Sequence, residues 1–375
     1  MLRARRGQWV RVFLVNELLG QTRDDTGGTD DEIGYDAGLL PFGVEPSPPR
    51  LPLEHLDAFG RPDRRTVSPR VSLHAGLVSF DVDSDDGAFV GRNHDGTVAP
   101  ARGREDHEAG GHAGEAAGRV VHRGGTVGDG GGHDHDAPNW TEYWWYCDEA
   151  LAPASHADGP GSVCHLQDMA DVRNHRHHGL VGALVVEPGD VWPFRPGSAS
   201  CEPDGFTGRE AELRLADGTL VAREGVAFVQ DGLRLFVGGH PDLPVPDVVP
   251  GDDPEDSGQK AVSLRTALVH RGVPPAGPLA DLPLVTAAAG DTLWLRLVGA
   301  GDKPRQHTLT LHGLAWKAAP WVPNGPWTGS VSGVAPGWAR DIVVHPVEPG
   351  DHALRTGAFR WGTEQGVWTT VRVTD

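Results

Sequence analysis

The sequence DVRNHRHHGLVGALVVEP, residues 171–188, joins a histidine-rich loop directly to an apolar run. His175, His177 and His178 fall within four positions. The glycine-punctuated run GLVGALVVEP behind them has the length and the β-branched content of a buried strand. Two interpretations stay open. Either the histidines are metal ligands at the mouth of a β-sandwich, or they form a solvated, partly protonated loop in which Arg176 opposes a metal ion.

Most other apolar segments have the period of two that is typical of half-buried strands. They are WVRVFLV (9–15), VSLHAGLVSFDV (71–82), AELRL (211–215), LRLFV (233–237), TLWLRLV (292–298), HTLTLHGLAW (307–316) and WTTVRV (368–373). The 52 Gly and 31 Pro residues supply many turn signals, and we find no long amphipathic helix. The pattern therefore predicts an all-β fold built from β-sandwiches.

A faint internal repeat indicates two sandwiches in tandem. Each half has a strand after a glycine, then a strand with Leu-His followed by Ala or Gly, and then a closing strand. We predict a first domain over 1–195 and a second over 205–375. Within them, 101–139 has the Gly- and His-rich composition of a disordered insertion, and 249–260 that of an acidic loop.

The formal net charge of −19 at pH 7 disfavours nucleic acid and anionic membranes as partners. The first twenty residues have a basic head and a short apolar run, but they lack a small-residue cleavage site. We interpret them as a strand rather than a signal peptide. The 12 Trp against 3 Tyr form an unusual aromatic balance to which the sequence attaches no function.

The three cysteines do not form a disulfide framework or a zinc-finger pattern, because no CxxC spacing is present. They are Cys147, Cys164 and Cys201. One pair could bridge in an oxidising compartment and leave one free thiol.

A blue-copper site needs two imidazoles and a thiolate, usually with a weak axial thioether. Cys164 and His165 end the segment GSVCH, His175 lies in the following loop, and Leu180 stands near the start of the closing strand. This order suits such a site. The alternative is that Cys164 is a buried small hydrophobe.

Four blocks resemble the multicopper oxidase and cupredoxin superfamily, and they look closest to ceruloplasmin-like bacterial copper oxidases. They are residues 71–100, 168–188, 300–316 and 349–368. The resemblance covers most of the chain outside 101–139. It implies two tandem cupredoxin-like Greek-key β-sandwiches and copper as the cofactor.

The resemblance also implies roles for single residues. Cys164 and His175 would hold the electron-entry copper, and other copper ions would be held by His74, His165, His307 and His312, with His177 or His178. Several family ligands are missing, however. Gly76 and Leu314 replace the second histidine of two His-x-His pairs. The alternative for His74 and His312 is that each is a satisfied interior residue.

Three functions follow from this pattern. The first is a multicopper oxidase that passes single electrons from a small-molecule or metal-ion reductant to dioxygen, with copper shared between subunits of a trimeric ring. The second is a degenerate, non-catalytic cupredoxin pair that binds copper or is purely structural. The third is a zinc site at His175, His177 and His178. The family resemblance would place the protein outside the cell or in the periplasm if a leader has been lost from the N-terminus.

Overall fold

The computed structural model describes most of the strand-forming chain. The described residues are 1–16, 70–88, 93–94, 96–98, 140–170, 175–198, 208–233, 259–263, 283–301, 306–319, 322, 324–346, 348–363 and 365–375, with the backbone of 19–20, 33–34, 44–46, 55–56, 62–63 and 235–237. No helix among them is long and apolar enough to cross a bilayer.

The first half of the chain forms two sheets that pack face to face. The larger has the order β1 (Leu2–Arg5), β11 (Val181–Glu187), β10 (Ser162–Gln167) and β8 (His74–Ala75), in which β1 is parallel to β11 and the other pairs are antiparallel. The smaller is the antiparallel pair β2 (Trp9–Val15) and β9 (Trp140–Tyr146). An apolar core that includes Tyr143, Trp145, Leu166 and Leu184 lies between them.

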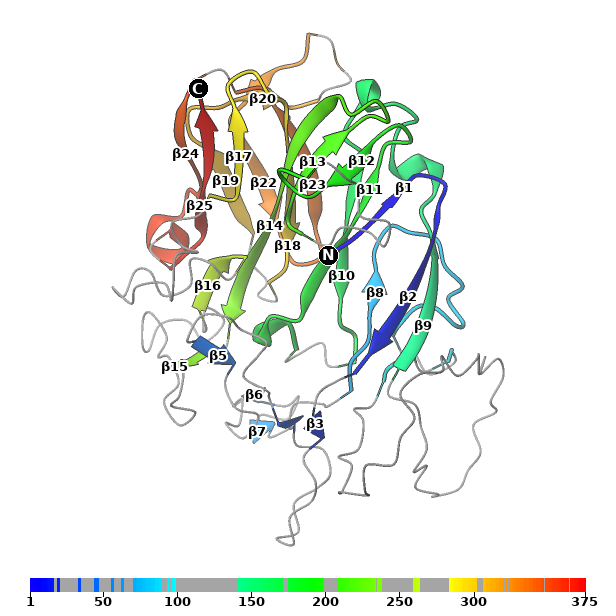
Figure 1. Cartoon of the computed structure of the whole chain (residues 1–375). Helices are drawn as coiled ribbons and strands as arrows, with labels where there is room; N and C mark the ends of the chain where they lie inside the picture. The colour runs from blue at the N-terminus through cyan, green and yellow to red at the C-terminus, as the bar shows by residue number, and fades with distance from the viewer. Residues whose placement is uncertain are drawn as a thin grey trace, which may run out of the picture.

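The second half forms a second sandwich (Figure 1). One sheet has the order β12 (Trp192–Phe194), β13 (Glu210–Arg214), β14 (Leu220–Leu233), β18 (Leu293–Gly299) and β23 (Ala339–Val344), with β16 (Gln259–Val262) also paired to β14. The other has the order β17 (Val285–Ala288), β25 (Trp368–Thr374), β24 (Gly350–Thr356), β19 (His307–Leu311) and β22 (Ser330–Val334). A core that includes Leu295, Leu309 and Val371 fills the space between them.

Short elements complete the described structure. The paired strands are β3 (Leu19–Gly20) with β4 (Ile33–Gly34), β5 (Val44–Pro46) with β15 (Leu235–Val237), β6 (His55–Leu56) with β7 (Pro62–Asp63), and β20 (Trp316–Lys317) with β21 (Trp327–Thr328). The single helical turns are η2 (Glu149–Leu151), η3 (His156–Asp158), η4 (His175–His178) and η7 (Phe359–Thr363).

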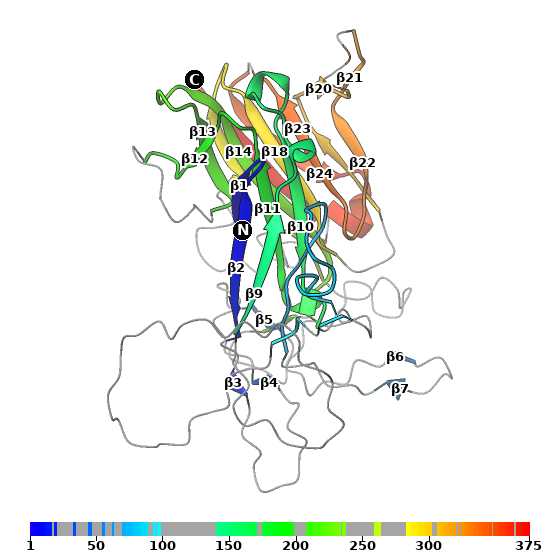
Figure 2. The same cartoon turned by 90° about the vertical axis from the view of Figure 1, so that its right-hand side faces the viewer.

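The two sandwiches meet along a seam between the four-stranded sheet and the β14–β18–β23 sheet (Figure 2). Val163 and Val185 from the first half pack there against Val226, Phe228 and Val298 from the second. Because both faces of these sheets are covered, their strands carry apolar side chains on both faces. The continuous apolar run of β11 is an example.

The seam also holds a buried charge cluster. The guanidinium of Arg296 binds Glu187 at 3.0 Å, Glu224 at 2.6 Å and Asp341 at 2.7 Å. Arg3 pairs with Glu187 at 2.9 Å and also with Glu224. These ion pairs join β1 and β11 of the first half to β14, β18 and β23 of the second.

The predicted all-β fold class, with two β-sandwiches, is confirmed. The predicted strand over 71–82 is largely wrong: in the fully described stretch 70–88, only His74–Ala75 forms a strand. Leu77 adopts a φ of 72°, which bends the chain away from an extended course.

The insertion 101–139 and most of the loop 249–260 lie outside the described residues. The domain limits stay a prediction, and β12 within the expected first domain pairs with β13 of the second.

Candidate functional site

Strand β10 sends neighbouring side chains into two different layers. Cys164 and Leu166 belong to the core of the first sandwich, whereas Val163 packs into the seam. Side chains alternate along a strand, so His165 shares the seam-facing side with Val163. The alternation therefore separates Cys164 from His165, although they are adjacent in sequence.

His165 is a buried imidazole without a partner. Its side chain is 5% exposed, and neither ring nitrogen has a hydrogen-bond partner among the described residues. Burial, together with smaller contributions from the charges of Arg176 and His74, lowers the pKa of His165 to about 4. The ring is therefore neutral near pH 7, which is the form that binds a metal ion.

His74 lies on the same side of this sheet as His165. It pairs with Gln167 across β8 and β10, and Gln167 is two residues from His165 on the strand. Nδ1 of His74 lies 2.8 Å from the carbonyl oxygen of Asp86 and 2.9 Å from its carboxylate. A carboxylate on one ring nitrogen orients a histidine so that the other nitrogen can bind metal. In the described part of the chain, Nε2 is therefore the nitrogen of His74 that is left to bind a metal ion.

Arg176 limits how much positive charge this place can hold. It lies on η4, and its Nη1 donates to the carbonyl oxygen of Gly301 at 3.4 Å. Because its guanidinium is close enough to lower the pKa of His165, it also opposes a metal ion there. A single cation bound between two imidazoles is compatible with this charge, whereas a cluster of several is not.

His175 pairs with a carboxylate through Nδ1, as His74 does. It is buried, and its Nδ1 lies 2.6 Å from Oδ1 of Asp168. The other carboxylate oxygen of Asp168 accepts from the backbone amide of Ser72 at 2.6 Å. The pair therefore ties the η4 turn to the segment before β8. The side chains of His177 and His178, also on η4, lie outside the described residues.

His307 on β19 and His312, directly after this strand, each have a partner. Nε2 of His307, which is buried, lies 3.4 Å from the carboxylate of Asp231. His312 is exposed, and its Nε2 accepts from Nε of Arg355 at 2.9 Å. A ring nitrogen that accepts a hydrogen bond from arginine is not free to bind a metal ion.

Cys164 has the surroundings of an apolar core residue. It lies in one cluster with Cys147, Ala75 and Leu184, and both thiols are free and buried. Burial raises the pKa of Cys164 to about 12, with a smaller contribution from Cys147. A thiolate ligand needs the opposite shift. The sequence left open a disulfide bridge between one pair of cysteines. Cys147 and Cys164 do not form it, and Cys201 lies outside the described residues.

Of the predicted ligands, the structure brings His74 and His165 together. No three His, Cys, Asp or Glu side chains in the described part of the chain group closely enough to hold a metal ion. In donor type, the two imidazoles fit a single copper ion, whereas the apolar surroundings of Cys164 do not fit a thiolate site. Sequence reasoning missed the carboxylates of Asp86, Asp168 and Asp231 that hold the histidines. Their separations from the histidines follow no regular spacing, so the sequence gives no signal that they meet.

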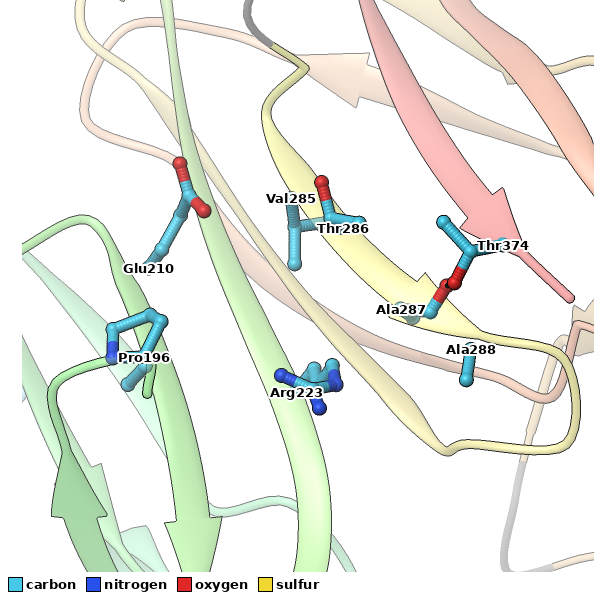
Figure 3. Close-up of a pocket in the computed structure, with 9 residues that line it drawn as sticks. Pro196, Glu210, Arg223, Val285, Thr286, Ala287, Ala288 and Thr374 are labelled. Carbon is cyan, nitrogen blue, oxygen red and sulfur yellow. Dashed lines mark hydrogen bonds between the residues drawn. The ribbon is translucent and has the colours of Figure 1, made fainter. Parts of the chain in front are cut away.

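A cavity of about 220 Å³ lies far from these histidines in the chain's second half. Figure 3 shows Glu210 on β13 and Arg223 on β14 at one side of the cavity, and Thr286 on β17 and Thr374 on β25 at the other. Nε of Arg223 donates to Asp291 at 2.8 Å and Nη1 to Glu212 at 2.7 Å. The guanidinium is thus held by the protein's own carboxylates, and none of the predicted ligands lines this cavity.

Comparison with known proteins finds similarity among solved structures alone. No protein-family model and no curated protein matches the chain. A blue copper oxidase from Nitrosomonas europaea is 17% identical over 64% of this chain and 63% of its own, with a TM-score of 0.35. The chain thus spans less than two thirds of that protein.

Two further structures align over the whole chain. A multicopper oxidase is 12% identical over 100% of this chain and 77% of its own, with a TM-score of 0.46. A copper nitrite reductase from Nitrosomonas europaea is 12% identical over 100% of this chain and 82% of its own, also at 0.46. The chain is similar to each of these two proteins.

Proposed function

We propose that this chain is a copper-binding protein of cupredoxin-like architecture, with a single copper held by His74 and His165 beside the seam. The observation that carries the proposal is the imidazole of His165, which is buried and has no hydrogen-bond partner at either ring nitrogen in the described part of the chain. Leaving such a group unsatisfied costs about 1–3 kcal/mol, so a ligand that engages it is favoured.

Copper is favoured by the donors and by the family resemblance. Neutral imidazole nitrogen suits copper and zinc alike, and affinity for a nitrogen site is generally higher for Cu²⁺ than for Zn²⁺. When bound, copper would supply one-electron redox chemistry. The residues themselves supply a neutral ring at His165, a ring at His74 oriented by Asp86, and Arg176 as a nearby fixed cation.

Oxidase activity toward a small-molecule or metal-ion reductant and dioxygen is a second, finer proposal. It requires more ligands than the described residues bring together. They would have to come from His177 and His178, or from a second copy in a ring. The degenerate, single-copper form needs neither, and the geometry supports it better.

Copper loading tests the proposal. The wild-type chain, His165→Leu and a surface control, His352→Ala, are loaded with Cu(II), desalted, and measured by elemental analysis and visible absorption. We expect copper in the wild type and the control, loss in His165→Leu, and no intense blue band. A wild type without copper would sink the proposal. Several retained coppers, with a blue band lost in Cys164→Ser, would support the oxidase instead.

A further inference from the structure

Sheet β2–β9 carries aromatic rings on the face that points away from the core. Val12, Tyr143 and Trp145 face inward and are buried. An antiparallel sheet with one solvated face normally carries polar residues there. The outward side chains here are instead Trp9, Arg11, Phe13 and Val15 on β2, and Trp140, Glu142, Trp144 and Tyr146 on β9. We call these eight residues the aromatic strip.

The strip is well exposed in the structure. Trp9 is 62% exposed, Phe13 51% and Trp144 43%. The rings of Trp9 and Tyr146 lie 5.2 Å apart, and those of Phe13 and Trp140 lie 6.1 Å apart, so the rings form pairs across the two strands. A contiguous exposed apolar patch often marks a binding site.

The polar residues of the strip are paired with each other. Arg11 donates to Glu142 through Nε at 2.6 Å and Nη2 at 3.0 Å, and its guanidinium lies 4.3 Å from the ring centre of Phe13. The strip is therefore neutral on a molecule of net charge −19. This charge repels polyanions, so single-stranded nucleic acid, which also stacks on aromatic rings, is disfavoured.

The shape of the strip favours a narrow, extended ligand. Its seven residues per strand span about 24 Å, and its two strands make it about 10 Å wide. A stable protein interface needs roughly 800 Å² from each partner, so the strip alone is too small for one. Outward positions along each strand are about 7 Å apart, and each of the four cross-strand pairs of the strip carries at least one aromatic ring, on one strand or the other.

We propose that the aromatic strip binds an extended, uncharged polysaccharide chain. The C–H face of a pyranose ring is apolar and carries partial positive charge, which is attracted to the negative face of an aromatic ring. The hydroxyl groups at the rim of each sugar can exchange hydrogen bonds with Arg11 and Glu142. A neutral sugar polymer also avoids the repulsion from the acidic surface. The site lies on β2 and β9 (Figure 1) and uses neither of the proposed copper ligands.

Native gels cast with hydroxyethyl cellulose test this proposal, with alginate as the anionic comparison. The variants are Trp9→Ala, Trp144→Ala and both together. Trp327→Ala is the matched control, because Trp327 is 63% exposed on β21. We expect hydroxyethyl cellulose, and not alginate, to retard the wild type. Each strip variant should weaken binding by roughly threefold to tenfold, and the control should not.

Three results would overturn the proposal. The first is no retardation of the wild type by hydroxyethyl cellulose. The second is retardation that survives in the double variant while far-ultraviolet circular dichroism shows a native fold. The third is a wild type that sediments as a dimer or binds phosphatidylcholine vesicles, with either property lost in the double variant and no binding to the polymer. The strip would then be an interface between copies or a membrane contact.

Discussion

Cys164 and His165 are adjacent on β10, yet the thiol lies in the core of the first sandwich and the imidazole faces the seam. Side chains of neighbouring strand residues point to opposite faces of a sheet. The two groups therefore cannot serve one copper ion without a local change in the strand. The separation divides their roles: the cysteine stabilises a core, and the histidine is available to a ligand.

Replacing Cys164 by serine should therefore destabilise the protein and leave copper binding intact. The hydroxyl would be buried in an apolar cluster, at a cost of about 1–3 kcal/mol. Urea unfolding of the copper-free protein measures the loss, and elemental analysis after loading measures the copper. Cys164→Ala, which buries no hydroxyl, serves as control. Loss of copper in both variants, with the fold retained, would show that the thiol is a ligand after all.

Replacing His165 by leucine should abolish copper binding and stabilise the copper-free protein. The change removes an unsatisfied buried imidazole and fills its place with an apolar side chain. We expect a gain of about 1–2 kcal/mol in the free energy of unfolding. Urea unfolding of both proteins in the presence of a chelator gives the difference. A leucine variant less stable than the wild type would indicate that the imidazole has partners that stabilise the fold.

The sequence was sufficient for the fold class because period-two patterning and turn signals are local. It placed β2, β18 and β25 within a residue or two of their observed limits. It failed at 71–82, where the left-handed backbone of Leu77 interrupts an alternating pattern that looks like a strand. The site was harder, because a spacing such as Cys-His does not reveal which layer each side chain enters. Nor does it reveal partners such as Arg355 for His312.

Glu187, in the buried cluster at the seam, should contribute a stability that falls as pH rises. Burial and the charge of Glu224 raise the pKa of Glu187 to about 8, above its ordinary value of 4.5. Between pH 4.5 and 8 the folded state therefore binds a proton on Glu187 that the unfolded state does not. The free energy of unfolding then decreases with pH across this window, with respect to this group. In Glu187→Gln this contribution should be missing.

Urea unfolding of wild type and Glu187→Gln at pH 5, 6, 7 and 8 tests that sign. The difference between the two proteins reports the titration of Glu187 together with its coupling to Glu224, because the more distant titrating groups behave alike in both. We expect the glutamine variant to gain on the wild type as pH rises. A constant difference over the window would mean that Glu187 is ionised throughout.

Arg296 should be the most costly single charge to remove from the seam. It is fully buried and binds Glu187, Glu224 and Asp341. In Arg296→Leu, Arg3 is the cation that remains paired with the two glutamates among the described residues. Breaking a buried ion pair from one side costs about 3–5 kcal/mol, because a charge is left without compensation. Arg372→Leu is the control: Arg372 pairs with Asp351 at 2.7 Å on the surface, and its loss should leave the urea midpoint unchanged.

A variant that neutralises the whole cluster separates charge from packing. In the fivefold variant Arg3→Met, Glu187→Gln, Glu224→Gln, Arg296→Met and Asp341→Asn, most of the stability lost in Arg296→Leu should return, because no unpaired charge of the cluster remains. The urea midpoints of the single and fivefold variants decide the matter. If both are equally unstable, the packing of Arg296 between the sheets, and not its charge, holds the two sandwiches together.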